Sequence, residues 1–239
     1  MKRLVVMILF MALMIDTLGW GMTGHRATGL IAEQFLTKKA KKRISALLGQ
    51  ESLALAAYWM DEIRSDTVLN RRIHPDWHWV TIQKGDTYAT SEKNPNGDNI
   101  AKSMEIVEKL KIGGLARETE VEYIKILLHL IGDLHQPLHV GRGDDQGGNR
   151  VKVKWFGDES NLHSVWDSGF IDGTRLSYTE LAASLPKPSS ATVKQWQGTS
   201  IVDWAMESSG YLDQLYQIGN GNLSYKYKYY NYPLVELRL

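Results

Sequence analysis

The chain has 239 residues, which is enough for a domain with a sizeable hydrophobic core. Hydrophobic residues make up 43% of the chain and charged residues 23%, so a disordered or collagen-like protein is excluded. With 28 Lys and Arg against 27 Asp and Glu, the sequence does not predict a basic surface that holds nucleic acid by charge alone. The absence of Cys excludes disulfides, thiolate nucleophiles and cysteine zinc sites.

Residues 1–19 have the pattern of a secretory signal peptide. Two basic residues near the start are followed by the apolar run Leu4–Ile15, and Thr17 and Gly19 are small residues suited to a cleavage site. The apolar run is too short for a membrane anchor, which needs about 20 residues. We therefore expect cleavage after Gly19, a mature chain of residues 20–239 without a membrane anchor, and a secreted or periplasmic location.

Most of the mature chain is predicted to be helical, because apolar residues recur at three- and four-residue spacing. Alternating apolar residues between Val151 and Trp155 predict a short strand, which we expect to be part of a small hairpin. In chain order, the predicted helices cover residues 24–36, 38–48, 51–63, 99–112, 117–135, 163–171, 178–184 and 192–216. The expected fold is a single, mainly α domain with a small β-hairpin, and the sequence ends at ELRL inside a further predicted helix.

The long segment 64–98 connects the third and fourth predicted helices. Loops of this length are usually functional or have structure of their own. The segment contains IHPDWHWV (73–80), which places aromatic residues on both sides of His78. We therefore expect part of the functional site to lie in this loop.

The densest group of potential metal ligands follows in the fifth predicted helix and just after it. His129 and Asp133 are four residues apart, so both side chains project from one face of the helix. His139 comes after the break at Pro137 and can point back toward them. Imidazole and carboxylate groups in this arrangement suit zinc.

A second His-x-x-x-Asp pair, His163 and Asp167, lies further along the chain, and His25, Asp61 and His78 lie upstream. A single His of this kind is more often a structural residue than a ligand. The repeated pairing, with more His and Asp in aromatic surroundings, favours a metal centre instead.

Two other histidines are left outside this expected centre. His74 precedes a proline in a loop and is predicted to be structural. His135 is two residues beyond Asp133 and so lies off its helix face; we expect at most an indirect role for it.

Six segments in order, WGxxGH, WxDEIR, WHWV, HLIGDxHQPLH, GGN and NLHSVWD, resemble the secreted zinc-dependent S1/P1 nuclease family of single-strand-specific nucleases. The resemblance runs from Trp20 to about Ile171 and reappears in the C-terminal segment YYNYPLVELRL. It implies a mainly helical domain, related to zinc phospholipases C, that holds three zinc ions at the base of a cleft.

The resemblance also implies the ligands of these three Zn²⁺ ions. The sets, zinc by zinc, are Asp61, His78, His129 and Asp133; the α-amine and carbonyl of Trp20, His25 and the bridging Asp133; and, at a more open third site, His139, His163 and Asp167. The amine of Trp20 would be created by removal of the signal peptide.

Residues that act on the substrate follow from the same resemblance. Arg64 is expected to contact the scissile phosphate and Asn149 to line the same site, so that with Asp61 and Asp133 they form the expected catalytic set. Trp79 aligns with a base-stacking residue of the family. The sequence leaves open whether Trp79 stacks on a base or packs in the core.

The function implied is hydrolysis of phosphodiester bonds in single-stranded DNA and RNA, as an endonuclease with 3′-nucleotidase activity that leaves 5′-phosphates. Close metal ions can lower the pKa of a shared water from about 15.7 to near 7, and the resulting metal-activated hydroxide would attack phosphorus. No Ser, Cys or His nucleophile is then required. The expected partner is the single-stranded nucleic acid substrate, and the expected state is a monomer.

Two alternatives stay open at this point. Thr81 stands where fungal members have an acidic base-contacting residue, and Gln146 falls where an apolar residue closes the base pocket. These departures keep open a phospholipase C-like zinc phosphodiesterase. A non-catalytic secreted zinc-binding protein is the other alternative; it is disfavoured because the third ligand set leaves a coordination position open, as catalytic sites do.

Overall fold

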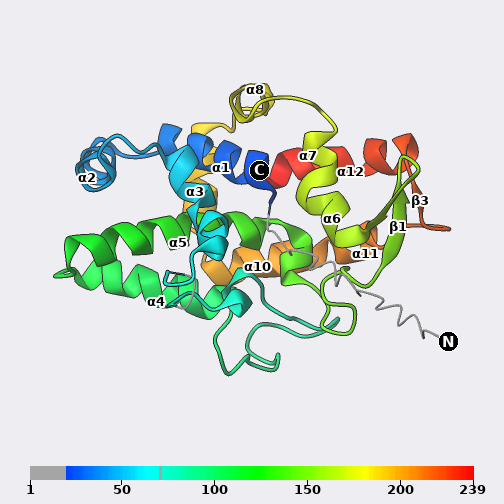
Figure 1. Ribbon diagram of the computed structural model, residues 1–239, viewed down its shortest axis with the longest axis horizontal. Helices are drawn as coiled ribbons and strands as arrows, with labels where there is room; N and C mark the ends of the chain where they lie inside the picture. The colour runs from blue at the N-terminus through cyan, green and yellow to red at the C-terminus, as the bar shows by residue number, and fades with distance from the viewer. Residues whose placement is uncertain (1–19, 70–71) are drawn as a thin grey trace, which may run out of the picture.

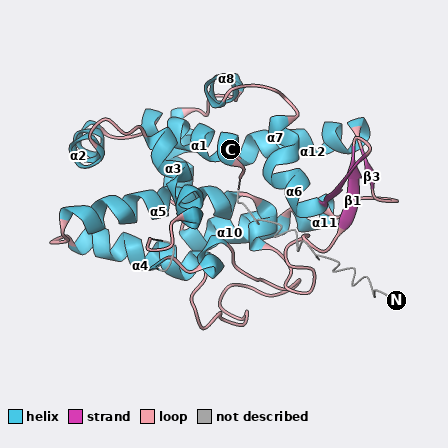
Figure 2. Ribbon diagram, in the orientation of Figure 1, coloured by secondary structure: helices cyan, strands magenta, loops and turns pink. Residues whose placement is uncertain are grey.

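The computed structural model describes residues 20–69 and 72–239 (Figure 1). The predicted signal peptide, residues 1–19, lies outside the described residues. Figure 2 shows helices over most of the described chain and one small sheet at the end of the molecule. The prediction of a mainly α fold is confirmed.

The longer helices follow the predicted segments. They are α1 (Met22–Gln34), α2 (Lys38–Leu48), α3 (Leu53–Glu62), α4 (Asn99–Ile112), α5 (Arg117–His135), α8 (Tyr178–Ser184), α9 (Ser190–Gln197), α10 (Ile201–Gly210) and α12 (Tyr225–Arg238). Side-chain caps fix several of their first turns. The hydroxyl of Ser52, for example, accepts a hydrogen bond from the amide of Leu55, so α3 begins at Leu53.

Shorter elements connect these helices. They are the 3₁₀ turns η1 (Ile63–Ser65), η3 (Pro75–His78) and η4 (Pro137–Val140), the helical segments α6 (Leu162–Ser164), α7 (Phe170–Asp172) and α11 (Leu212–Leu215), and the π-helical turn η5 (Val165–Gly169). The segments α6, η5 and α7 follow one another directly, where the sequence predicts one helix over 163–171. Part of the long segment 64–98 is therefore structured, because η3 lies within it.

The predicted helix over 192–216 is divided into α9, α10 and α11. Ser200 begins α10 with a capping box, in which its amide donates to Asp203 Oδ2 at 2.8 Å and its hydroxyl accepts from the Asp203 amide at 3.1 Å. The periodicity of apolar residues continues across this break, which is why the pattern predicts one helix.

The predicted hairpin is confirmed. Strand β1 (Lys152–Trp155) pairs antiparallel with β2 (Asp158–Asn161), and the two-residue turn of Phe156 and Gly157 has φ angles of 52° and 99°. A third strand, β3 (Asn222–Leu223), pairs parallel with β1 and was not predicted from the sequence. Two residues are too few for an alternation pattern to show.

Helices α1, α3 and α5 pack closely enough to bring polar side chains together in the interior. A Cβ at Gly29 of α1 would lie 2.4 Å from the carbonyl oxygen of Leu53, so only glycine permits this approach of α1 to α3. Apolar clusters flank the contact region; one contains Trp166 and Phe170, and another Met60 and Leu130. No helix among the described residues is long and apolar enough to cross a lipid bilayer.

Candidate metal centre

Eight of the predicted metal ligands converge in the interior, and each is at most 5% exposed. They come from α1, α3, η3, α5, η4, α6 and η5, and they are His25, Asp61, His78, His129, Asp133, His139, His163 and Asp167. Three groups among them place ligand atoms within 4.8 Å of one another: His25, Asp61 and His129; His78, His129 and Asp133; and His139, His163 and Asp167. Each group can hold a metal ion.

Asp133 belongs to the second group and also contacts His25 of the first. Its Oδ1 lies 3.1 Å from His25 Nε2, and its Oδ2 lies 3.0 Å from His78 Nδ1 and 3.2 Å from His129 Nε2. His139 Nδ1 is 4.0 Å from the same Oδ2. Nitrogens from four elements thus face both oxygens of one carboxylate, which suits a ligand that bridges two cations.

The imidazoles in these two groups also approach one another. The distance between His78 Nδ1 and His129 Nε2 is 3.1 Å, and the rings of His25 and His129 stack with centroids 3.9 Å apart. Asp61 Oδ1 is 3.8 Å from His129 Nε2. Nitrogen lone pairs at this separation repel unless a proton or a cation lies between them.

The third group is separate from the first two. His163 Nε2 lies 3.1 Å from Asp167 Oδ2, and His139 Nε2 lies 3.6 Å from Asp167 Oδ1. The resemblance implies a more open site here. In this structure the three residues are 1–4% exposed, so the third group is as covered as the other two.

Backbone carbonyls orient three of the rings. In each case Nδ1 donates to a carbonyl oxygen, which leaves Nε2 to face the cluster. These bonds run from His129 to Ala57 (2.9 Å), from His139 to His78 (2.8 Å) and from His163 to Gly147 (2.6 Å). Such outer hydrogen bonds are typical of metal-binding histidines.

Burial and charge shift the pKa values of the cluster in different directions. Burial lowers the pKa of His78 to about 4 and also lowers the pKa of His25. Although burial opposes it, the carboxylates of Asp133 and Asp167 raise the pKa of His139 to about 9. Burial likewise opposes the effect of His129 and His139 on Asp133, yet they hold the pKa of Asp133 well below its usual range. The cluster therefore combines a His139 that favours its protonated form with His25 and His78 that favour their neutral forms.

The donor set fits divalent metal ions. Several buried ligand atoms have no hydrogen-bond partner among the described residues; they include Asp61 Oδ2, Asp133 Oδ1, His25 Nδ1, His139 Nε2 and His163 Nε2. Burying so many polar atoms without partners is costly, and coordination to cations would satisfy them. Imidazole nitrogen and carboxylate oxygen are ligands that zinc accepts.

The glycine-rich loop after η4 supports the third group. Gly147 has φ of +58°, and a Cβ on it would lie 2.4 Å from the carbonyl oxygen of Leu138. A Cβ on Gly141 would lie 2.5 Å from the same oxygen. The loop therefore wraps tightly around η4 and presents the Gly147 carbonyl to His163.

Three residues predicted to act on the substrate lie around the cluster. Arg64 Nη2 is 3.0 Å from Asp61 Oδ1, and its side chain is 27% exposed, so the guanidinium connects the buried site to solvent. Asn149 is half-buried and donates to the carbonyl of Gln146 at 3.0 Å. Trp79 is half-buried and belongs to none of the apolar clusters of the described chain, which disfavours a core role.

Trp20 lies two residues before the start of α1, and its side chain is fully buried in the apolar cluster of Trp166. The next residue, Gly21, donates its amide to the carbonyl oxygen of Asp167 at 2.7 Å. The start of the described chain is thus fixed beside the third ligand group. The role of the Trp20 amine and carbonyl as ligands stays a prediction.

The two histidines left outside the centre have structural positions. His74 Nδ1 accepts a hydrogen bond from the amide of Asp76 and caps η3, as predicted. His135 faces away from the cluster, where its Nδ1 donates to the carbonyl of Ile131 and its ring lies 5.8 Å from that of Trp204.

Sequence reasoning missed Gln136. This fully buried side chain donates from Nε2 to Asp167 Oδ1, and its Oε1 accepts from the amide of Leu138 at 2.6 Å. It therefore joins the end of α5 to a ligand of the third group. Its position directly before Pro137, between the predicted ligands Asp133 and His139, is the signal that could have indicated it.

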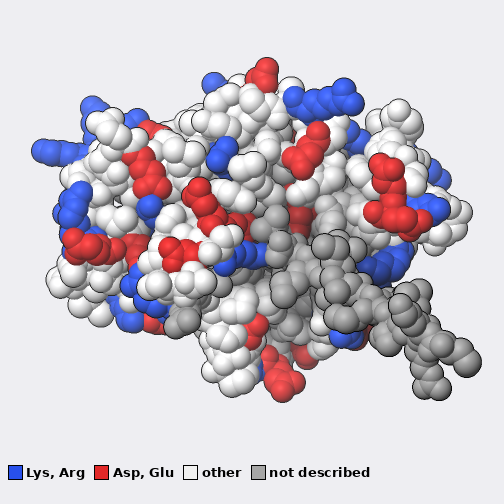
Figure 3. Space-filling view, viewed as in Figure 1, with Lys and Arg blue, Asp and Glu red and all other residues white. Residues whose placement is uncertain are grey.

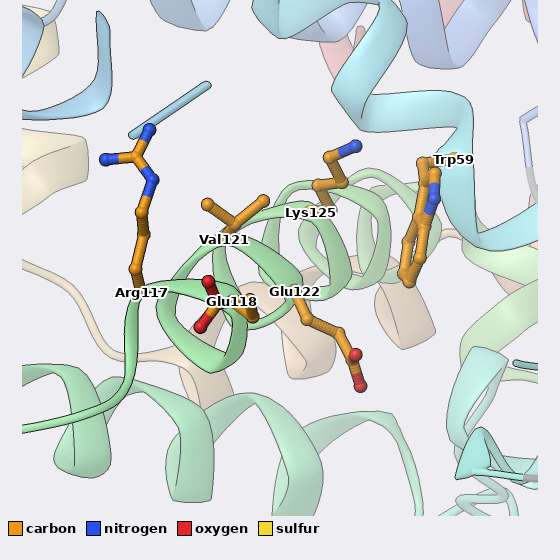
Figure 4. A pocket seen from close by; sticks show the side chains of 6 residues that line it. All are labelled: Trp59, Arg117, Glu118, Val121, Glu122 and Lys125. Carbon is orange, nitrogen blue, oxygen red and sulfur yellow. The ribbon is translucent and has the colours of Figure 1, made fainter. Parts of the chain in front are cut away.

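An open groove of about 240 Å³ lies elsewhere, along α5 (Figure 4). It is lined by Trp59, Arg117, Glu118, Val121, Glu122 and Lys125. Lys125 pairs with Glu51 at 2.6 Å and lies 5.3 Å from the ring centroid of Trp59. None of the predicted ligands lines this groove, so its shape does not mark the metal centre.

The fold and the cluster define a mainly helical protein with buried His and Asp groups suited to metal ions. The family model S1/P1 Nuclease matches residues 20–239, and the chain belongs to this family. The protein is therefore a hydrolytic nuclease.

Relatives agree with this membership. The chain is 26% identical to Endonuclease 4 of Arabidopsis thaliana, over 89% of this chain and 76% of that protein. It is 24% identical to Nuclease S1 of Aspergillus oryzae, over 92% and 86% of the two chains. It is also 27% identical to Nuclease P1 of Penicillium citrinum, over 62% of this chain and 57% of that protein.

Proposed function

We propose that this nuclease uses three zinc ions to hydrolyse phosphodiester bonds in single-stranded DNA and RNA, as an endonuclease with 3′-nucleotidase activity that leaves 5′-phosphates. The observation that carries the proposal is the convergence of eight buried His and Asp side chains into three groups. Family membership supplies the reaction class, and the chemistry of the donor set favours zinc.

The proposed ligand sets are those that the family resemblance implies. The third set coincides with the third geometric group, whereas the structure groups Asp61 with His25 and His129. Asp61, His78, His129 and Asp133 hold one zinc; His25, Asp133 and the amine and carbonyl of Trp20 hold another; and His139, His163 and Asp167 hold the third. The contacts of both Asp133 oxygens with imidazole nitrogens support its bridging role. When bound, zinc lowers the pKa of water to near 7 and offsets negative charge on a phosphoryl group.

The residues of the chain position the substrate around that centre. The guanidinium of Arg64 is held by Asp61 at 3.0 Å and is partly exposed, so it can donate to the oxygens of the scissile phosphate. Donors fixed before the reaction stabilise developing charge without having to reorganise. Asn149 is proposed to line the same site; its buried Oδ1 has no hydrogen-bond partner among the described residues.

The proposed preference of the enzyme for single strands rests on the stacking of unpaired bases on Trp79. An unpaired base exposes its face, and stacking on an aromatic side chain is worth about 1–3 kcal/mol per base. Trp79 directly follows the ligand His78 and is half-buried, outside the apolar clusters of the described chain. Thr81 lies against the glycine-rich loop, since a Cβ on Gly143 would come within 2.9 Å of its methyl group. A methyl and hydroxyl at this position indicate a base preference different from that of an acidic residue.

The proposal includes export. The first 19 residues have a signal-peptide pattern, and cleavage after Gly19 would create the α-amine of Trp20 beside the centre. The mature enzyme would then be secreted or released into the periplasm as a monomer.

The experiment uses the mature chain 20–239, loaded with zinc and incubated with single-stranded DNA, single-stranded RNA and duplex DNA. We expect cleavage of the single strands, loss of cleavage with a chelator, and 5′-phosphate ends. Asp133→Asn should abolish activity, and His74→Ala, which alters a histidine outside the centre, should not. Intact single strands with three zinc ions bound would contradict the proposal, and turnover of phosphatidylcholine in their place would indicate a phospholipase C-like enzyme.

A further inference from the structure

Arg26 of α1 is a cation without a counter-ion beside the candidate metal centre. It directly follows the ligand His25 and is half-buried. Its Nε is buried without a hydrogen-bond partner, and its guanidinium forms no ion pair with any other described residue. Arginine is seldom buried unless it is paired, because a charged group loses hydration in the interior. An arginine in this state is suited to bind an anion from outside the chain.

The packing of α1 against α3 directs Arg26 toward a metal ligand (Figure 1). Gly29 of α1 meets Leu53 at the start of α3. Arg26, one turn nearer the start of α1, lies over the side chain of Tyr58, with Cζ 5.7 Å from the ring centroid. Tyr58 is three residues before the ligand Asp61, so the two are neighbours on the surface of α3. The contact of the two helices thus advances toward Asp61, and Arg26 lies at that end of it.

A second arginine lies near the same phenol. Burial raises the pKa of Tyr58, and the carboxylates of Asp61 and Glu62 raise it further. The positive charges of Arg26 and Arg64 oppose this rise. Charges act on a pKa in this way only at short range, so both guanidinium groups lie near the Tyr58 hydroxyl. Arg64 also contacts Asp61 at 3.0 Å, and the structure thus places two arginines along one side of the metal centre.

The visible surface charge is mixed in sign. On the side seen in Figure 3, basic and acidic side chains are interspersed rather than gathered into one large patch of a single sign. The whole chain has 28 Lys and Arg against 27 Asp and Glu. Attraction of a polyanion to the centre therefore depends on individually placed cations rather than on net charge. Because Arg64 is assigned to the scissile phosphate, Arg26 is the neighbouring cation that can contact another one.

We propose that Arg26 binds the phosphate next to the scissile one in a single-stranded polynucleotide, so that the enzyme favours linkages inside a chain over isolated phosphate esters. A guanidinium donates two parallel hydrogen bonds to the non-bridging oxygens of a phosphate. The face of Tyr58 supports the guanidinium and keeps it beside α3. Because the proposed function supplies the substrate, this inference rests on it; the added element is the recognition of a second phosphate.

The test uses the zinc-loaded mature enzyme and thymidine dinucleotides with one central phosphodiester. A methyl phosphate diester, which is negatively charged, is attached at the 5′ end of one substrate and at the 3′ end of another. Matched substrates carry a neutral dimethyl phosphate triester at the same ends. The preference is the ratio of kcat/KM for cleavage of the central bond in the charged and neutral substrates. Because it is a ratio, it does not depend on the fraction of enzyme that is folded and loaded.

The variants are Arg26→Gln and Arg26→Lys. Arg43→Gln is the matched control, because Arg43 pairs with Glu120 on the surface. Thermal unfolding confirms that each variant is folded. Calorimetric titration with dinucleotides whose central linkage is an uncleavable methylphosphonate measures the same preference as binding, so the test does not need hydrolysis.

We expect the wild type to prefer the charged substrate about tenfold at one of the two ends, and that end identifies the phosphate that Arg26 contacts. Arg26→Gln should bring the ratio close to one. Arg26→Lys should keep part of the preference, since the charge remains but the paired hydrogen bonds are lost, and Arg43→Gln should keep all of it. A wild type without preference at either end, or a wild-type preference in Arg26→Gln, overturns the proposal. An Arg26-dependent preference in binding by an enzyme that cleaves no substrate would support the role of Arg26 and contradict the proposed function.

Discussion

Gly132 of α5 lies directly against the ring of His25, and a Cβ at this position would come within 3.0 Å of His25 Nδ1. The glycine sits one residue before Asp133, which His25 Nε2 faces at 3.1 Å. The close approach of α1 to α5 thus depends on a missing side chain. The rigid helix backbone cannot easily withdraw, so an added methyl would displace the imidazole.

Gly132→Ala should therefore impair the ligand group of His25 more than it destabilises the helix. Alanine is favoured over glycine inside a helix by about 0.5–1 kcal/mol, so a loss of zinc and activity with little loss of helicity would identify the contact as the cause. Mass spectrometry measures the zinc content, steady-state kinetics measures kcat, and circular dichroism measures the helicity. Gly210→Ala, at the end of α10 where nothing lies within 4 Å, is the control and should retain both. Full zinc occupancy in Gly132→Ala would show that the His25 imidazole tolerates a methyl group at position 132.

Gln136→Leu should weaken the third ligand group. The change keeps the side-chain volume but removes the donor to Asp167 and the acceptor for the Leu138 amide. Outer-shell partners of this kind typically contribute 10–100-fold in metal affinity or activity, so a decrease of about that size is expected. Titration with a competing chelator measures the affinity. Gln195→Leu, on the exposed surface of α9, should behave as the wild type.

Arg64→Lys should lower kcat about 10–100-fold and leave zinc content unchanged. Lysine keeps the positive charge but cannot form the two parallel hydrogen bonds that a guanidinium offers to a phosphate. Steady-state kinetics on single-stranded DNA tests this expectation. Arg72→Lys, whose arginine pairs with Glu122 on the surface, is the matched control. Equal kcat values for Arg64→Lys and Arg72→Lys would show that Arg64 does not contact the scissile phosphate.

Zinc removal should destabilise the fold as well as stop the reaction. Without cations the cluster contains unpartnered buried polar atoms and facing imidazole nitrogens. A ligand present at 1,000 times its dissociation constant adds about 4 kcal/mol to the free energy of unfolding, so the thermal midpoint should fall by several degrees after chelation and return when zinc is restored. Differential scanning fluorimetry measures the shift. An unchanged midpoint would show that the empty cluster is as stable as the filled one.

His135 should make the protein less stable in mild acid. Burial, together with the charge of Arg238, lowers its pKa from 6.5 to about 4. The unfolded chain takes up a proton below pH 6.5 that the folded chain does not, so stability is lost as the pH falls from 6.5 toward 4, by up to about 3 kcal/mol. Urea midpoints at several pH values should fall less steeply in His135→Gln than in the wild type. If the urea midpoints of the wild type and His135→Gln fell equally with pH, the loss of stability in acid would not come from His135.

Local spacing made much of the site predictable. The i, i+4 pairs His129–Asp133 and His163–Asp167 indicate shared helix faces from residue order alone, and both pairs lie in the cluster. The resemblance then supplied Asp61 and the remaining ligands, whose convergence depends on tertiary packing that no local pattern encodes.

Other features were not predictable, for physical reasons. Gln136 acts through a contact 31 residues away, and the two-residue strand β3 exists only because β1 lies beside it. The division of residues 192–216 follows from a hydroxyl cap at Ser200, a local contact that outweighs the continuing apolar periodicity.

The ligands of the candidate centre are spread from His25 to Asp167, over more than half of the polypeptide. A nascent chain leaving the ribosome has to complete α6 and η5 before the last ligand group exists, and closing such long loops is a late event in folding. A nascent chain that ends before Asp167 therefore lacks the third ligand group.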